Sequence, residues 1–219
     1  MSRPEPTGRR YGRYIGVLGL LILVLITVNT ALTKPNGVTG LDPGQRLAPF
    51  AVPLALGDVV GDADVAAAAD QGAAGRRPAC AVRGPGILNV CQLYEQGPVV
   101  LALFVNAGAC PAVLEDLQNL APSFPGVRFA AVAIKGDRKG VRRMIRSRGL
   151  TTLPVGIDRD GALAGLYKLA SCPQVTFAYP GGVVQSKALL TRPSPATLRA
   201  RVSELVQAAR ARGWRGAAK

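Results

Sequence analysis

The side chains in this chain that can do covalent chemistry are four cysteines, Cys80, Cys91, Cys110 and Cys172. The chain contains no histidine, which excludes Ser-His-Asp and Cys-His catalysis and any imidazole metal site. Thiol chemistry remains, in the form of disulfides, thiol–disulfide exchange or thiolate ligation of a metal. From their number alone, four cysteines can pair in three ways.

Cys110 stands at a position that favours a reactive thiolate. It follows a nearly unbroken apolar run, residues 99–105, which is typical of a strand buried on both faces. A turn of small residues, 106–109, leads to Cys110, Pro111 and an apolar helical stripe that ends at Leu120. A thiol at a helix N-terminus experiences the positive end of the helix dipole and unpaired backbone N–H groups, and both favour the thiolate.

Cys80 and Cys91 are expected to form a local structural disulfide. The residues between them include Gly84-Pro85-Gly86, a turn that would let the two thiols approach each other. Neither cysteine stands at an evident helix start, so a catalytic role for this pair is the less favoured alternative.

The N-terminal segment predicts a membrane anchor. Residues 2–14 carry four arginines and one glutamate, whereas residues 15–33 are uncharged and largely apolar, which is long enough to cross a bilayer. The positive charge before this span places residues 1–14 in the cytoplasm and the rest of the chain outside. We therefore expect a single-pass protein of the cell membrane with an extracytoplasmic C-terminal domain. A cleaved signal peptide is the alternative, and in both cases the domain faces an oxidising compartment where disulfides persist.

The formal net charge of +14 comes mostly from arginine. The basic residues are not interleaved with aromatic ones, so we expect no binding of nucleic acid. Residues 137–148 predict a helix whose surface is covered by arginine and lysine. We interpret this basic face as solvated, with contact to anionic lipid or to an acidic partner as the alternative.

The order of apolar segments predicts an α/β domain. Predicted helices separate the first four strands, and a hairpin and a last helix follow. Alternating strands and helices favour parallel pairing, to which the hairpin adds antiparallel strands. The predicted strands are residues 98–105, 127–134, 153–157, 174–179 and 183–189. The predicted divisions are a linker at 34–43, the domain at 44–212 with a surface excursion at 58–92, and a tail at 213–219.

This order of elements resembles the thioredoxin superfamily and, within it, membrane-anchored extracytoplasmic proteins of the redoxin type. The residues that carry the resemblance are Gly44, Ala48, Pro49 and Phe50, then residues 99–104 with Cys110 and Pro111, then Pro173, and finally Phe177, Tyr179, Gly181 and Gly182. The C-x-x-C motif of the family is degenerate here, because Val113 replaces its second cysteine. The peroxiredoxin motif is also absent, because Ala107 and Leu103 stand where threonine and proline are required.

The resemblance implies a thioredoxin-like fold, with a central mixed sheet flanked by helices and a cis peptide bond before Pro173. It also implies that Cys172, the residue before this proline, lies against Cys110. We therefore expect a thiol–disulfide oxidoreductase in which Cys110 attacks a protein or small-thiol disulfide and Cys172 resolves the mixed disulfide. The main alternative is a binding or structural module with a permanent Cys110–Cys172 disulfide. A peroxidase and a copper(I) thiolate site are further alternatives, and no cofactor or resident metal is expected.

Overall fold

The computed structural model describes residues 8–32, 40–65 and 78–216, and the chain divides into two units, residues 1–37 and 38–219. The first unit contains one described helix, α1 (Gly8–Leu32). In the part of the chain that the structure describes, no helix is long and apolar enough to cross a membrane. The predicted transmembrane helix at residues 15–33 therefore has no support from the structure, and residue 33 lies outside the described residues.

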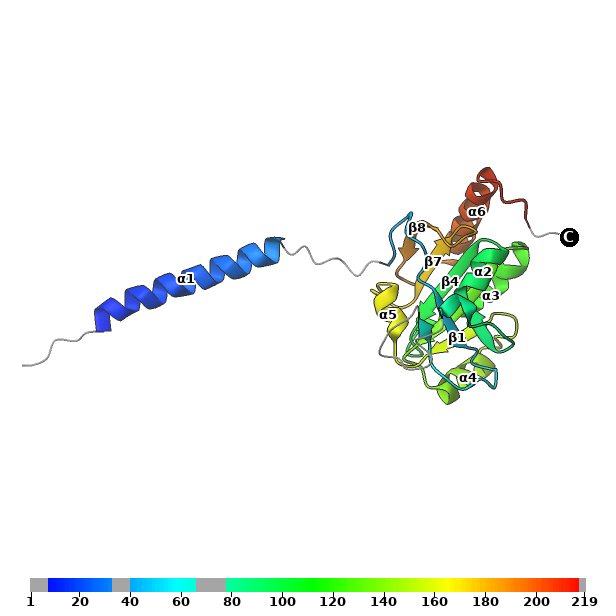
Figure 1. Cartoon of the computed structure of the whole chain (residues 1–219), viewed down its shortest axis with the longest axis horizontal. Coiled ribbons are helices and arrows are strands. Elements are labelled where there is room, and N and C mark those ends of the chain that lie inside the picture. The colour runs from blue at the N-terminus through cyan, green and yellow to red at the C-terminus, as the bar shows by residue number, and fades with distance from the viewer. Residues whose placement is uncertain (1–7, 33–39, 66–77, 217–219) are drawn as a thin grey trace, which may run out of the picture. The chain divides into compact units, whose positions relative to one another are not determined.

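The second unit is organised around a five-stranded mixed sheet with the order β6-β5-β4-β7-β8 (Figure 1). Strand β5 is parallel to β4 and β6, whereas β7 is antiparallel to β4 and β8. The predicted mixed sheet and its terminal hairpin are confirmed. The strands are β4 (Val99–Phe104), β5 (Arg128–Ile134), β6 (Val155–Asp158), β7 (Gln174–Ala178) and β8 (Val184–Leu189).

Helices cover both faces of this sheet, which explains why the central strand β4 is apolar throughout. Successive side chains of a strand point to opposite faces. Val100, Ala102 and Phe104 pack in a core cluster with α3, α4 and α6, and the alternate residues of β4 pack on the other face with α2 and α5. The helices are α2 (Val90–Gln96), α3 (Val113–Leu120), α4 (Arg138–Ser147), α5 (Ala162–Leu166) and α6 (Pro195–Ala211).

A second sheet comes from residues that the sequence places in an arm and a surface excursion. Strand β1 (Phe50–Pro53) pairs antiparallel with β2 (Asp64–Val65) and β3 (Ile87–Asn89). The predicted excursion at 58–92 is thus only partly an excursion, because it supplies two strands and the start of α2. Residues 66–77 lie outside the described residues.

The ends of the domain pack closely where they are described. Leu41 is buried, and the N–H of Gly40 donates to the carbonyl of Lys168, so the domain begins before the predicted boundary at Gly44. At the other end, Trp214 packs against the core cluster on the α6 side of the sheet. The predicted tail at 213–219 therefore starts as part of the folded domain, and residues 217–219 lie outside the described residues.

Candidate active site

The strand–turn–helix segment around Cys110 forms as the sequence predicts. Strand β4 ends at Phe104, and an exposed turn leads to a short 3-10 helix (Cys110–Ala112) that continues directly into α3. Pro111 is tolerated there because the first helical turn leaves its N–H groups without intrahelical partners. The Cys110 residue is 9% exposed, whereas the turn before it is exposed to solvent.

The structure joins Cys110 to Cys172 by a disulfide, with 5.4 Å between the Cα atoms of residues 62 positions apart. Cys172 lies in the loop before β7 and is half-buried. The bond between Cys172 and Pro173 is cis, and Pro173 is buried. The strand pairing explains this approach, because β7 lies directly beside β4, and the start of one is therefore next to the end of the other.

One backbone donor faces both sulfurs. The N–H of Val105 points to the Sγ of Cys172 at 2.9 Å and to the Sγ of Cys110 at 3.4 Å. A hydrogen bond to a thiolate stabilises the charged form. This N–H can therefore stabilise the sulfur that leaves as a thiolate when another thiolate attacks the disulfide. Sequence reasoning missed this donor because every residue type except proline supplies a backbone N–H. The only sequence signal is that residue 105 follows the last residue of the strand.

Valine in place of the second cysteine of a C-x-x-C motif is part of the core. Val113 is fully buried and packs in the cluster that also contains Cys110 and Leu114. The helix therefore offers Cys110 no local partner, and the loop before β7 provides the sulfur instead.

The second disulfide joins Cys80 to Cys91, with 5.4 Å between the Cα atoms. The expectation that neither cysteine stands at a helix start is wrong for Cys91, which lies in the first turn of α2. The side chain of Asn89 caps this helix: its oxygen accepts the N–H groups of Cys91 and Gln92, and its nitrogen donates to two carbonyls of the Cys80 segment, those of Ala79 and Val82. Cys91 is fully buried, which suits a structural bond.

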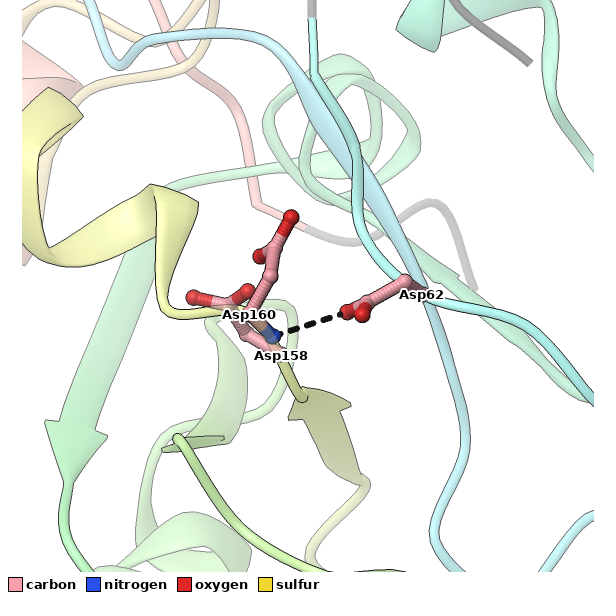
Figure 2. Close-up of side chains that lie close together, drawn as sticks. All are labelled: Asp62, Asp158 and Asp160. Atoms are coloured by element: carbon pink, nitrogen blue, oxygen red, sulfur yellow. Dashed lines mark hydrogen bonds between the residues drawn. The ribbon is translucent and has the colours of Figure 1, made fainter. Parts of the chain in front are cut away.

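Three carboxylates that the sequence analysis does not single out come together at another part of the domain (Figure 2). The oxygens of Asp62, Asp158 and Asp160 lie within 4.8 Å of one another. Burial raises the pKa of Asp158 to about 7, and the hydrogen bond that its protonated carboxyl donates to Asp160 adds to this effect.

Backbone N–H groups donate hydrogen bonds to the carboxylates of this cluster. Asp158 accepts the N–H groups of Gly161 and Leu163, and Asp62 accepts those of Ala63, Arg159 and Asp160. The cluster therefore has a structural role: Asp62 fastens the segment before β2 to the turn that follows β6.

No protein-family model matches the chain, and no curated protein matches it. Among solved structures, it is similar to a candidate thiol:disulfide interchange protein DsbE from Chlorobium tepidum, with a TM-score of 0.55 and 15% identity over 77% of this chain and 98% of the other. It is also similar to the thioredoxin domain of a thiol-disulfide oxidoreductase from Bacteroides vulgatus, with a TM-score of 0.54 and 12% identity over 76% and 99% of the two chains.

The chain has a thioredoxin-like fold. A candidate protein disulfide isomerase from Bacteroides thetaiotaomicron shares this fold, with a TM-score of 0.55 and 13% identity over 77% of this chain and 94% of the other. At these identities the similarity shows the fold alone. The thioredoxin-like fold predicted from the sequence is confirmed, whereas the catalytic roles of Cys110, Cys172 and Pro173 stay predictions.

Proposed function

We propose that this protein is a thiol–disulfide oxidoreductase whose redox centre is the Cys110–Cys172 disulfide. The observation that carries the proposal is the environment of this bond. It links a helix start to a loop, it lies beside an exposed turn, and the N–H of Val105 faces both sulfurs. The names of the proteins that share the fold describe the same chemistry, which is consistent with the proposal.

The proposed exchange needs no group beyond the two cysteines and the substrate. A substrate thiolate attacks the Sγ of Cys110, the bond to Cys172 breaks, and the sulfur of Cys172 leaves as a thiolate that accepts the N–H of Val105. A second substrate thiolate then attacks the mixed disulfide and releases Cys110. Two electrons pass from the substrate to the protein, which becomes a dithiol. A substrate disulfide reverses these steps, with Cys110 as the attacking thiolate and Cys172 as the resolving one.

The chain's disulfides are consistent with an extracytoplasmic location, which we include in the proposal. Together, the two disulfides use all four cysteines of the chain. Such bonds persist in oxidising compartments. The expected substrates are the thiols or disulfides of proteins or of small molecules.

A second candidate function is supported by the low exposure of Cys110. A disulfide with one nearly buried sulfur suits a permanent cross-link in a module that binds a partner without redox chemistry. The two functions differ in whether the disulfide opens in the folded protein.

Variants in which one cysteine of the Cys110–Cys172 pair is replaced test the proposed order of attack. They are made in the full chain and are reduced before the assay. In Cys172→Ser, Cys110 has no resolving partner, so a fluorescent peptide disulfide should give a lasting mixed disulfide at Cys110, located by mass spectrometry. Cys110→Ser is the matched control and should give an adduct at Cys172 at least about tenfold more slowly, because helix-start activation of the thiolate is lost. Faster labelling of Cys110→Ser would reverse the assigned roles. No adduct in either variant would refute the exchange function.

A further inference from the structure

The outer surface of α4 carries three cations that the fold itself does not use. Arg138 and Arg142 donate to backbone carbonyls of residues 55–59, and Arg148 forms an ion pair with Glu115. By contrast, Lys139, Arg143 and Arg146 are exposed and have no hydrogen-bond or ion-pair partner among the described residues. Their spacing of four and three residues places them on one side of the helix. We call these three residues the free basic stripe.

Two hollows connect this stripe to the turn that precedes Cys110. One has a volume of about 320 Å³ and is lined by the turn residues Asn106, Ala107 and Gly108, by Pro111 and by Arg143. The other has a volume of about 790 Å³ and is lined by the basic residues of α4. Because Arg143 and Ser147 line both hollows, a bound chain can lie in both at once and still reach the residue next to Cys110.

The surroundings of the hollows leave the charge of the stripe largely uncompensated. Asp137 precedes α4 and caps it by accepting the N–H of Gly140. Glu115 is already paired with Arg148, which lines the smaller hollow. A cationic hollow raises the local concentration of anionic partners and speeds their encounter.

We infer that the free basic stripe binds an acidic polypeptide segment next to the cysteine that exchanges with Cys110–Cys172. This inference rests on the proposed function and specifies its substrate class: proteins with aspartate or glutamate close to their reactive thiols. The geometry favours a polypeptide over a lipid surface because the smaller hollow reaches Pro111, the residue next to Cys110, and shares two lining residues with the larger one. The exchange is the one written above, in which the substrate dithiol becomes a disulfide and the protein disulfide becomes a dithiol.

The test compares two dithiol peptides of equal length, one with glutamates on both sides of its cysteines and one with lysines there. The oxidised full chain is mixed with each peptide. Alkylation and mass spectrometry then measure how fast the Cys110–Cys172 bond is lost. Flanking charges also change the thiol pKa of each peptide. Each rate is therefore divided by the rate of the same peptide with uncharged hydroxyethyl disulfide.

The acidic peptide should react about tenfold faster than the basic one at low salt. This ratio should approach one at about 500 mM NaCl, because salt screens exposed charges. Arg143→Gln should lower the rate of the acidic peptide about two- to threefold. Arg199→Gln is the matched control, because Arg199 is an exposed arginine of α6 outside both hollows, and it should leave the rate unchanged.

Three outcomes separate this inference from the proposed function. Equal rates for the two peptides, or equal losses in Arg143→Gln and Arg199→Gln, would overturn the inference and leave the exchange function intact. Binding of the oxidised protein to vesicles of anionic lipid through Arg143, without any preference between the peptides, would assign the stripe to a membrane instead. Failure of both peptides to open the disulfide would refute the proposed function itself.

Discussion

The stability that each disulfide contributes distinguishes a redox centre from a permanent cross-link. In the chain-entropy description, closing a loop of 62 residues stabilises the folded state by about 4 kcal/mol and closing one of 11 residues by about 3 kcal/mol. On loop length alone, Cys110–Cys172 should therefore stabilise the fold more than Cys80–Cys91.

Our account predicts the opposite order. A disulfide that opens readily in the folded protein has a reduction potential at least about 50 mV above the structural range, which corresponds to roughly 2–3 kcal/mol. Folding and disulfide formation are reciprocally coupled. A disulfide that is easier to reduce by this free energy therefore stabilises the folded state by the same amount less. Cys110–Cys172 should thus contribute only about 1–2 kcal/mol, whereas the Cys80–Cys91 bond should contribute its full amount.

The assay is urea unfolding of the full chain, followed by the fluorescence of Trp214, the single tryptophan, which packs against the core. The two variants are Cys110→Ala with Cys172→Ala, and Cys80→Ala with Cys91→Ala. A loss of about 4 kcal/mol in the first variant, larger than the loss in the second, would refute the reasoning and favour the permanent cross-link.

Three further predictions concern buried polar groups. Burial raises the pKa of Asp158 to about 7. Between about pH 4 and pH 7, the folded state therefore binds more protons than the unfolded state. The free energy of unfolding that this group contributes falls as pH rises through that range. Asp158→Asn should remove this dependence, so that the free energy of unfolding of the variant relative to the wild type rises from pH 4 to pH 7; a constant difference would contradict the pKa shift. Tyr167→Phe should lower the free energy of unfolding by about 1–2 kcal/mol, because the buried hydroxyl donates to the carbonyl of Ala48 at 2.8 Å; an unchanged midpoint in urea would show that water replaces this bond. Asn89→Ala should cost about 2–4 kcal/mol, since it removes a helix cap and the donors of two carbonyls; a loss below 1 kcal/mol would mean that α2 does not depend on its cap.

The central sheet could be predicted from the sequence because burial on both faces leaves a clear signal. Residues 99–104 are apolar without interruption, and the structure buries all of them. The helix over residues 138–147 could also be predicted from the sequence, because Val141, Met144 and Ile145 form an apolar stripe among basic residues. The structure buries all three.

The second sheet and α2 could not be predicted in the same way. The strands β2 and β3 are two and three residues long, too short for an alternating pattern to stand out. Helix α2 spans only seven residues, and its clearest signal is the capping side chain of Asn89 rather than a periodic face. The carboxylate cluster was missed for a related reason, because Asp62 is distant in sequence from Asp158 and Asp160.

The candidate site depends on both local and non-local information. The position of Cys110 at a helix start follows from local sequence, whereas its partner Cys172 came only from the resemblance to the thioredoxin superfamily. Residue spacing alone leaves three pairings open, and only the pairing of β4 with β7 brings these two cysteines together.

The most direct test of the central claim is the reduction potential of the Cys110–Cys172 pair in the folded full chain. The protein is equilibrated in a series of dithiothreitol buffers, and alkylation with mass spectrometry measures the reduced fraction of each pair, with Cys80–Cys91 as the internal control. The account predicts a potential above about −250 mV for Cys110–Cys172, in the range of catalytic disulfides, while the other pair stays oxidised. A potential below about −300 mV would contradict the account, because a bond of that strength is a structural cross-link.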